Sequence, residues 1–470
     1  MRAPLASRCA AAGIFVLAAA LAGCLMGPNY QRPAVAVPPA YRAPGAAAAS
    51  APAPGLGAEK WTQLYPDPVL RKLIQTALTR NYDVRIAATR VLEAQEQAGI
   101  TRAAEFPAAA VEAGVVSERN PQTARNLTAY STGFGHLNLD VIWNLDFWGR
   151  YRRATEAARD QWLATQWGQR AVVSSVVAQV AAGYFQLRQL DDALAIAQQA
   201  VAARQDSLRL TQVLAKYGSA SELDVSQAQE LLAQAGATVP DVQRRIAQQE
   251  DLLSTLIGDN PESIPRGAPL AAQPNPPAVP AGLPSSLLER RPDVRQAEAE
   301  LMAANAEIGV ARASLFPNIS LTGSGGAESY ALNRLFTASG KQWNLAANLV
   351  QPVFAAGSLR AGVRLSEAQK QQMLLSYQQT LQQAFRQVSD ALVELRRDHE
   401  TRAQQQQLAA AAAKAEQLSN ILYKNGGGSY LQVLVAETNS FNAQLALSQA
   451  ELNERLALVE LYNALGGGWQ

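Results

Sequence analysis

The chain carries two copies of one long unit. Asp83-Val84-Arg85 recurs as Asp293-Val294-Arg295 after 210 residues, and the pattern Gly-x-x-Ser-x-Leu-x-Val that begins at Gly218 recurs at Gly426 after 208 residues. A unit of this length is far longer than the repeats of solenoid proteins, which span about 20 to 50 residues. The duplication therefore predicts a fold built from two pseudo-symmetric halves.

The N-terminus has the features of an export signal. Arg2 and Arg8 precede an apolar run that ends at Ala22, and this run is too short to cross a bilayer as a helix. Leu21-Ala22-Gly23-Cys24 resembles a bacterial lipobox, in which the cysteine becomes the acylated N-terminus. We therefore predict a lipoprotein signal peptide at residues 1–23 and covalent lipid, palmitate included, on Cys24. Ordinary signal cleavage beside an incidental cysteine is the alternative.

Charge and cysteine content exclude several classes of protein. Removing residues 1–23 takes away two arginines and no acid, so 41 basic residues become 39 against 39 acidic ones, and no basic face indicates a nucleic-acid partner. One cysteine remains, which rules out an internal disulfide. No apolar stretch after Cys24 is long enough for a transmembrane helix, so any membrane crossing is expected to use strands.

Proline-rich segments separate the parts of the chain. Residues 24–60 lack apolar periodicity and predict an extended, lipid-anchored tether. Residues 261–292 predict a proline-rich linker between the two copies. Repeat 1 then occupies residues 61–260, and repeat 2 occupies residues 293–470.

Each repeat contains a pattern typical of a long helical hairpin. Apolar residues are spaced by threes and fours through both copies, which is the rhythm of a coiled-coil seam. We predict hairpins at about 149–257 and 357–465, with Ser221 and Ser429 as the N-caps of the return helices. Pro240 is expected to kink or break the first return helix.

Before each long helix the period changes to two. Apolar and polar residues alternate over about ten positions, as they do from Leu137 to Phe147, and this pattern is typical of a strand with one apolar and one polar face. We expect two strands in each repeat, at about 106–118, 132–147, 316–328 and 342–354.

Four such strands cannot close a barrel alone. An open sheet edge inside lipid leaves backbone groups unpaired at a cost of several kcal/mol each, so closure requires more chains. Two chains would give eight strands and a barrel filled by its own side chains, whereas three would give twelve strands and room for a conduit. The polar face, which includes Asp140 and Asp146, would then line water, and the apolar face would meet lipid.

Several motifs stand in order along the chain: Leu21-Ala22-Gly23-Cys24, Tyr30-Gln31-Arg32-Pro33, Asp67-Pro68, Ser221-Glu222-Leu223-Asp224-Val225, Arg290-Arg291-Pro292-Asp293-Val294-Arg295-x-Ala297-Glu298 and Ala313-x-Leu315-Phe316-Pro317. Together they resemble the TolC-like outer membrane factors, and most closely the NodT-type outer membrane lipoproteins of resistance-nodulation-division efflux systems. The resemblance covers essentially the whole mature chain.

The resemblance implies a mainly α fold with a membrane β-barrel. It implies a homotrimer with a 12-stranded barrel in the outer membrane and a 12-helix periplasmic α-barrel, with two pseudo-repeats in each chain. It also implies a passive exit duct of a tripartite efflux pump, which contributes to antibiotic resistance. The partners would be a periplasmic adaptor (membrane fusion) protein and an inner-membrane transporter driven by proton flow.

The resemblance places a periplasmic gate at the tip of the second hairpin, at Tyr423, Lys424, Leu431 and Val435. Pump-associated relatives form an apolar ring at the position of Leu431, and an aspartate commonly stands at the position of Val435. This chain has valine there, followed by Glu437. We therefore expect a closed tip held mainly by apolar packing, with Lys424 pairing across chains. A contact in the helix core is the alternative for Leu431.

The remaining charged residues have plainer explanations. Asp224 stands at the start of a return helix, where a carboxylate favours the helix dipole. Asp140 and Asp146 fall on the strand face assigned to the lumen, where they could influence ion selectivity or form a solvated polar lining.

An enzyme is not indicated. The histidines are His136 and His399, and the chain has no His-Glu-x-x-His, no Gly-x-Ser-x-Gly and no phosphate-binding glycine loop. No cofactor or metal is predicted, apart from the lipid on Cys24. Two other functions stay open: a TolC-like duct for type I protein secretion, and a lipid-anchored periplasmic coiled-coil scaffold without a pore. The alternating strands argue against the scaffold.

Overall fold

The structure is a computed structural model that describes residues 25–39, 41, 56–121, 130–273 and 284–470. The predicted signal peptide, Cys24 and parts of the predicted tether and linker lie outside the described residues. The chain divides into two compact units. The first unit comprises Met1–Ala34, Arg90–Thr165 and Gln296–Tyr377, and the second comprises Val35–Thr89, Gln166–Arg295 and Gln378–Gln470.

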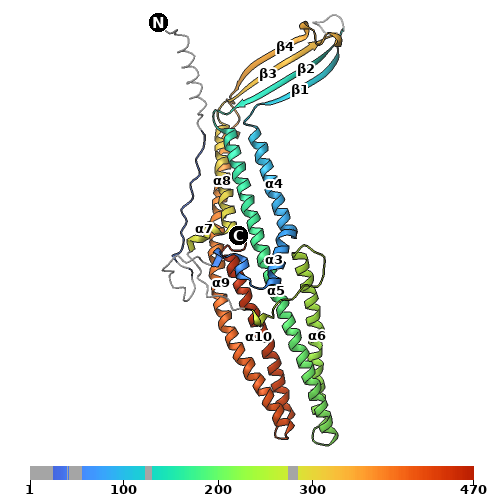
Figure 1. The fold of residues 1–470 in the computed structure, drawn as a ribbon. Helices are drawn as coiled ribbons and strands as arrows, with labels where there is room; N and C mark the ends of the chain where they lie inside the picture. The colour runs from blue at the N-terminus through green and yellow to red at the C-terminus, as the bar shows by residue number, and fades with distance from the viewer. Residues whose placement is uncertain (1–24, 40, 42–55, 122–129, 274–283) are drawn as a thin grey trace, which may run out of the picture. The chain divides into compact units, whose positions relative to one another are not determined.

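The helices repeat in length and order (Figure 1). Helices α9 and α10 begin 208 residues after α5 and α6, and α8 begins 210 residues after α4, as the sequence repeats do. The paired helices are α5 (Arg150–Lys216) and α9 (Ser358–Lys424) with 67 residues each, α6 (Glu222–Leu256) and α10 (Tyr430–Ala464) with 35 each, and α4 (Tyr82–Ala103) and α8 (Pro292–Ala313) with 22 each.

A four-stranded antiparallel sheet lies in the first unit (Figure 1). Its order is β1 (Ala108–Asn120), β2 (Tyr130–Leu145), β3 (Asn318–Ser329) and β4 (Lys341–Val350), so each repeat contributes two neighbouring strands. Each strand extends one or two residues beyond its predicted segment at one end and stops two to four residues short at the other. Pro107, Pro317 and Pro352 lie just outside β1, β3 and β4, because proline has no N–H to donate to a ladder.

Short elements surround the helices of the second unit. They are η1 (Leu56–Ala58), α2 (Trp61–Leu64), α3 (Pro68–Arg80), η2 (Leu270–Ala272), η3 (Pro284–Ser286) and α7 (Leu287–Arg290); the first unit adds η4 (Leu332–Arg334) and η5 (Ala338–Gly340). Asp67 caps α3 by accepting a 2.8 Å hydrogen bond from the Val69 N–H. Its other carboxylate oxygen accepts hydrogen bonds from Tyr184 and Gln273, which links the start of α3 to α5 and to Gln273 of the predicted linker.

The long helices bury the apolar seam that the sequence predicts. Val177, Val180, Tyr184 and Leu187 of α5 are fully buried in the second unit, as are Leu381 and Val388 of α9. These are the positions spaced by threes and fours. A single helix could not bury such a stripe alone, so the packing of neighbouring helices is what stabilises these long elements.

Of the kink or break predicted at Pro240, the break is wrong, because α6 runs without interruption from Glu222 to Leu256. Pro240 leaves the carbonyl of Gly236, one turn earlier, without a donor. Pro240 is exposed, and a Cβ atom added at Gly236 would meet nothing within 4 Å. The helix continues past both residues.

Within the described residues, every helix is too short or too polar to cross a membrane.

Candidate functional site

The register sorts the side chains of the sheet into a polar face and an apolar face. One row of the polar face joins Ala110, Asp140, Ser324 and Asn344 across the four strands. The apolar face carries large side chains that are exposed in the single chain: Val111, Val115, Leu139, Trp343, Leu345 and Leu349. An exposed apolar surface of this extent marks a region that contacts a membrane or another protein.

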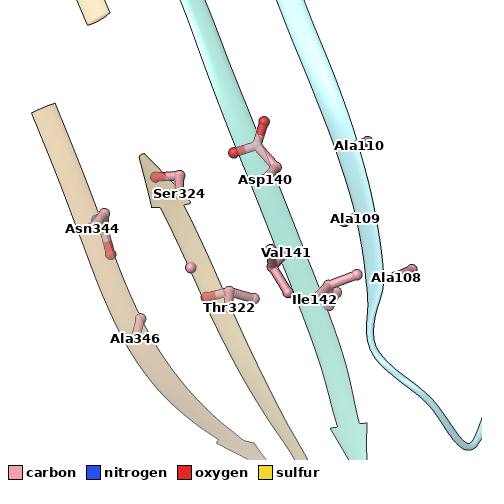
Figure 2. Close-up of a pocket in the computed structure, with 11 residues that line it drawn as sticks. Ala108, Ala109, Ala110, Asp140, Val141, Ile142, Thr322, Ser324, Asn344 and Ala346 are labelled. Carbon is pink, nitrogen blue, oxygen red and sulfur yellow. The ribbon is translucent and has the colours of Figure 1, made fainter. Parts of the chain in front are cut away.

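A hollow of about 480 Å³ lies on the polar face. Figure 2 shows the side chains that line it: most are small, and the carboxylate of Asp140 is the charged group among them. The neighbouring row, Ala108, Ile142, Thr322 and Ala346, is likewise mostly small. Small side chains leave space above the sheet, so this face can line a passage.

Charge is distributed unequally between the two faces. Among strand residues whose side chains the structure describes, the polar face carries Glu112, Glu118, Asp140 and Glu328, with His136 and no lysine or arginine. His136 Nε2 lies 3.7 Å from the Glu112 carboxylate, and the ring fits over Gly114, where a Cβ would approach it to 2.6 Å. The polar face is therefore electronegative.

The two outer strands each have one free edge within the described sheet. Strand β1 pairs with β2 alone and β4 pairs with β3 alone, so their outer backbone groups meet no further strand of the described chain. Exposed edges of this kind pair readily with a strand from another chain. Both outer strands of the described sheet therefore have an edge at which a further strand could pair.

The described residues after Cys24 are bound to the first unit. The Met26 N–H donates to the Trp148 carbonyl at 3.2 Å, close to the end of β2. Arg153 of α5, which is almost fully buried, donates to the Met26 carbonyl and to the Asn29 side chain. The segment thus holds position 25 next to the base of the sheet, where Trp148 stacks on Phe316 with ring centroids 4.8 Å apart.

Asp146 lies one residue beyond the end of β2. Its carboxylate accepts hydrogen bonds from the Tyr151 and Arg152 backbone N–H groups at 3.1 and 3.0 Å, and it pairs with the Arg152 guanidinium at 3.2 Å. Asp146 therefore caps the first turn of α5, a role that strand alternation did not indicate.

The two hairpin turns are closed differently. The Ser221 hydroxyl accepts from the Asp224 N–H at 3.2 Å, and the Asp224 carboxylate accepts from the Ser221 N–H at 2.8 Å, which forms a capping box. The structural role predicted for Asp224 is thus confirmed. Ser429 occupies the N-cap position of α10, but its side chain makes no capping hydrogen bond, so that prediction is only half right.

The four predicted gate residues divide into two groups. Leu431 and Val435 lie one turn apart on α10 and are 58% and 48% exposed. Tyr423 instead packs against Tyr430 with ring centroids 5.5 Å apart, beside the buried Val433. Lys424 is exposed at the last residue of α9. The apolar pair therefore faces outward from its own chain, while Tyr423 is partly buried against the cluster around Val433.

Sequence reasoning missed a buried charged cluster between the two hairpins. Arg204 of α5 and Glu437 of α10 are 2% and 5% exposed and line a common cavity with Glu416 of α9. The available signal was the position of these charges on the apolar side of long helices. The sequence position of these charges does not show which helices pack against one another, so it could not predict that the three side chains lie together.

Within the described ranges, no group of three or more His, Cys, Asp or Glu side chains is placed to hold a metal ion.

Comparison with known proteins gives a consistent result over most of the chain. The family model described as outer membrane efflux protein matches residues 73–259 and 283–467, which cover both repeats. The cation efflux system protein CusC of Escherichia coli O6:H1 is 34% identical over 458 residues, with 97% of this chain and 98% of the relative covered.

Two further proteins are similarly close. The solvent efflux pump outer membrane protein SrpC of Pseudomonas putida is 36% identical, with 96% of each chain covered. The crystal structure of the open state of the Neisseria gonorrhoeae MtrE outer membrane channel aligns with a TM-score of 0.85 at 30% identity, over 95% of this chain and 99% of that one.

Proposed function

The chain belongs to the outer membrane efflux protein family and acts in the outer membrane, and from this premise we propose that three copies form the exit duct of a tripartite efflux pump. The family resemblance noted in the motifs is confirmed. In the proposed assembly the three sheets close a 12-stranded barrel, and the helical hairpins form a 12-helix periplasmic tunnel. The duct conducts passively and catalyses no reaction.

The single observation that carries the proposal is the sheet with two open edges, one apolar exposed face and one polar hollow face. Closure with copies of itself would pair β1 of one chain with β4 of the next. The apolar face would then meet lipid hydrocarbon, in which every backbone polar group must be paired. Three copies give an interior wide enough for a conduit, whereas two give a filled barrel.

The N-terminal segment supports a lipid anchor on Cys24. Residues 25 and 26 lie at the base of the sheet, beside the stacked Trp148 and Phe316. Aromatic side chains gather at the boundary between lipid and water in barrels of this class. An acyl group on Cys24 would therefore enter the bilayer next to the barrel wall.

The exposed Leu431 and Val435 support an apolar gate at the tips of the second hairpins. In a three-fold assembly, three such pairs would meet around the axis and exclude water. Lys424 would reach a neighbouring chain from the same tip. A periplasmic adaptor and an inner-membrane transporter are the proposed partners.

The cargo is proposed to be small molecules, chosen by the transporter. The names of the two relatives refer to different cargoes: cations for CusC and solvents for SrpC. A duct shared by such different cargoes would conduct whatever its transporter delivers.

A matched pair of variants in β1 tests the proposal. Val111→Lys places a charge on the face assigned to lipid, where lysine costs about 2–4 kcal/mol near the bilayer midplane. Glu112→Lys makes a similar change one residue later on the face assigned to water. We expect Val111→Lys to lose heat-modifiable assembly and conductance in planar bilayers, and Glu112→Lys to keep both. Equal tolerance of the two lysines would refute the assignment.

Growth of a deletion strain tests the function in cells. Loss of the gene should sensitise cells to dyes, detergents or antibiotics, and the wild-type gene should restore resistance where the Val111→Lys variant does not.

A further inference from the structure

Two ionisable side chains are buried between the hairpins α5–α6 and α9–α10 of the second unit. Arg204 of α5 and Glu437 of α10 are both more than nine-tenths buried. Together with Glu416 of α9 they line a cavity of about 150 Å³. Burying a charge is costly unless it is paired and hydrogen-bonded. The charge state of this cluster therefore affects the free energy of packing the two hairpins together.

Arg204 connects the two hairpins. Its Nη1 donates a 2.8 Å hydrogen bond to the carbonyl of Leu231 on α6. Its guanidinium centre lies 5.0 Å from the ring centroid of Phe441 on α10. Its Nη2 makes no hydrogen bond with the described protein. One side chain therefore contacts the return helices of both hairpins, and separating the hairpins would break the contact with Phe441.

Glu437 faces an unbalanced set of charges. Arg204 from α5 attracts its carboxylate and Glu416 from α9 repels it. Ser207 of α5 and Asn420 of α9 favour its charged form, and Tyr430 stands two turns earlier on α10. From α6, the cluster receives the carbonyl of Leu231. One guanidinium thus faces two carboxylates, while Oε2 of Glu437 makes no hydrogen bond with the described protein.

Burial, followed by repulsion from Glu416, raises the pKa of Glu437 from 4.5 to about 7, against the opposing effect of Arg204. A raised carboxyl pKa means that the packed hairpins favour the protonated form. Protonation of Glu437 therefore stabilises the packed arrangement of the two hairpins. This stabilisation is complete below about pH 4.5 and is lost as the pH rises through about 7. Alkaline conditions therefore leave an excess negative charge in the cavity.

We propose that Arg204, Glu416 and Glu437 form a proton-controlled latch between the two helical hairpins. With Glu437 neutral, Arg204 and Glu416 balance and the hairpins stay together. When Glu437 loses its proton, the second hairpin separates more readily from the first. Its consequence for transport rests on the duct proposed above: the latch would set how easily the tip that carries Leu431 moves.

Hydrogen–deuterium exchange of the full-length protein in detergent tests the latch without any transport assay. The readout is protection of the peptides around residues 416 and 437, corrected for the intrinsic pH dependence of exchange. Between pH 6 and pH 8.5 the separated population of the wild type should rise about tenfold, as expected for a carboxyl whose pKa falls from about 7 to about 4.5 on separation. Glu437→Gln should abolish this rise and keep protection high at both values.

Two further variants complete the test. Glu230→Gln makes the same chemical change at an exposed position of α6 and should retain the wild-type response. Glu416→Gln leaves Glu437 titratable but removes the repulsion, so it should move the transition to lower pH. A wild-type protein with equal protection at both pH values, an unchanged response in Glu437→Gln, or an unmoved midpoint in Glu416→Gln would overturn the proposal.

These outcomes are separable from the proposed function. A duct that conducts normally but shows no pH-dependent exchange would remove the latch alone. A pH-dependent latch in a protein that forms no channel would remove the duct alone.

Discussion

The guanidinium of Arg32 donates two hydrogen bonds to the carboxylate of Glu298, from Nε at 2.5 Å and from Nη2 at 2.7 Å. The two residues are 266 positions apart, and each belongs to a motif that carried the family resemblance. The pair fixes the N-terminal segment to α8, with a further hydrogen bond from the Tyr30 hydroxyl to the same carboxylate at 3.3 Å.

Breaking this pair should loosen the N-terminal segment. Arg32→Ala removes one partner of a carboxylate whose side chain is 7% exposed, and a hydrogen bond to a charged group contributes about 1.5–3 kcal/mol. We expect a lower thermal unfolding midpoint and faster proteolysis near residue 32. Arg209→Ala, which breaks the exposed pair with Asp206 at 3.4 Å, is the control and should cost about 0.5 kcal/mol or less. Equal losses in the two variants would contradict the anchoring role.

The two hairpin turns should respond differently to the same substitution. Ser221→Ala removes the capping hydroxyl of α6 and should destabilise the protein by about 1 kcal/mol. Ser429→Ala removes a hydroxyl that makes no capping bond to α10, so its cost should be smaller. Chemical denaturation of the purified proteins measures both. A larger loss for Ser429→Ala would show that the second turn is capped after all.

The electronegative polar face should make the duct prefer cations. Asp140→Asn removes one carboxylate from each copy in the hollow on this face, and the ratio of cation to anion permeability should fall by roughly twofold. Lys341→Gln, on the opposite face, should leave the ratio unchanged. Reversal potentials in salt gradients across planar bilayers give the ratios. An unchanged ratio in Asp140→Asn would place its carboxylate away from the conduit.

The exposed pair on α10 should control the resting conductance. Leu431→Ala shortens a side chain that is 58% exposed in the single chain, so folding stability should change by about 0.5 kcal/mol or less. The apolar seal between copies would be weakened, and conductance at rest should rise. Gln432→Ala, the exposed neighbour, is the control. Unchanged conductance in Leu431→Ala would exclude the apolar gate.

The periodic elements could be predicted from the sequence because their patterns are local. The period-two run from Leu137 predicts a strand, and β2 occupies Tyr130–Leu145. The spacing of Val177, Val180 and Tyr184 predicts a seam, and all three are buried. The equal lengths of the paired helices follow from the duplication of the sequence.

Other features depend on contacts that no local pattern encodes. The alternation continues through Asp146, but its carboxylate accepts hydrogen bonds from backbone N–H groups in the first turn of α5. Pro240 alone predicts a kink or a break, yet α6 continues through it. The burial of Arg204 and Glu437 depends on which helix faces meet, and the pairing of Arg32 with Glu298 depends on where a distant segment lies.

Counting the subunits tests the central claim most directly. Native mass spectrometry of the mature protein, extracted from outer membranes in detergent, should give three chains per complex, because three four-stranded sheets would close a barrel wide enough for a conduit. A single chain that remains folded with its strands intact would contradict the account.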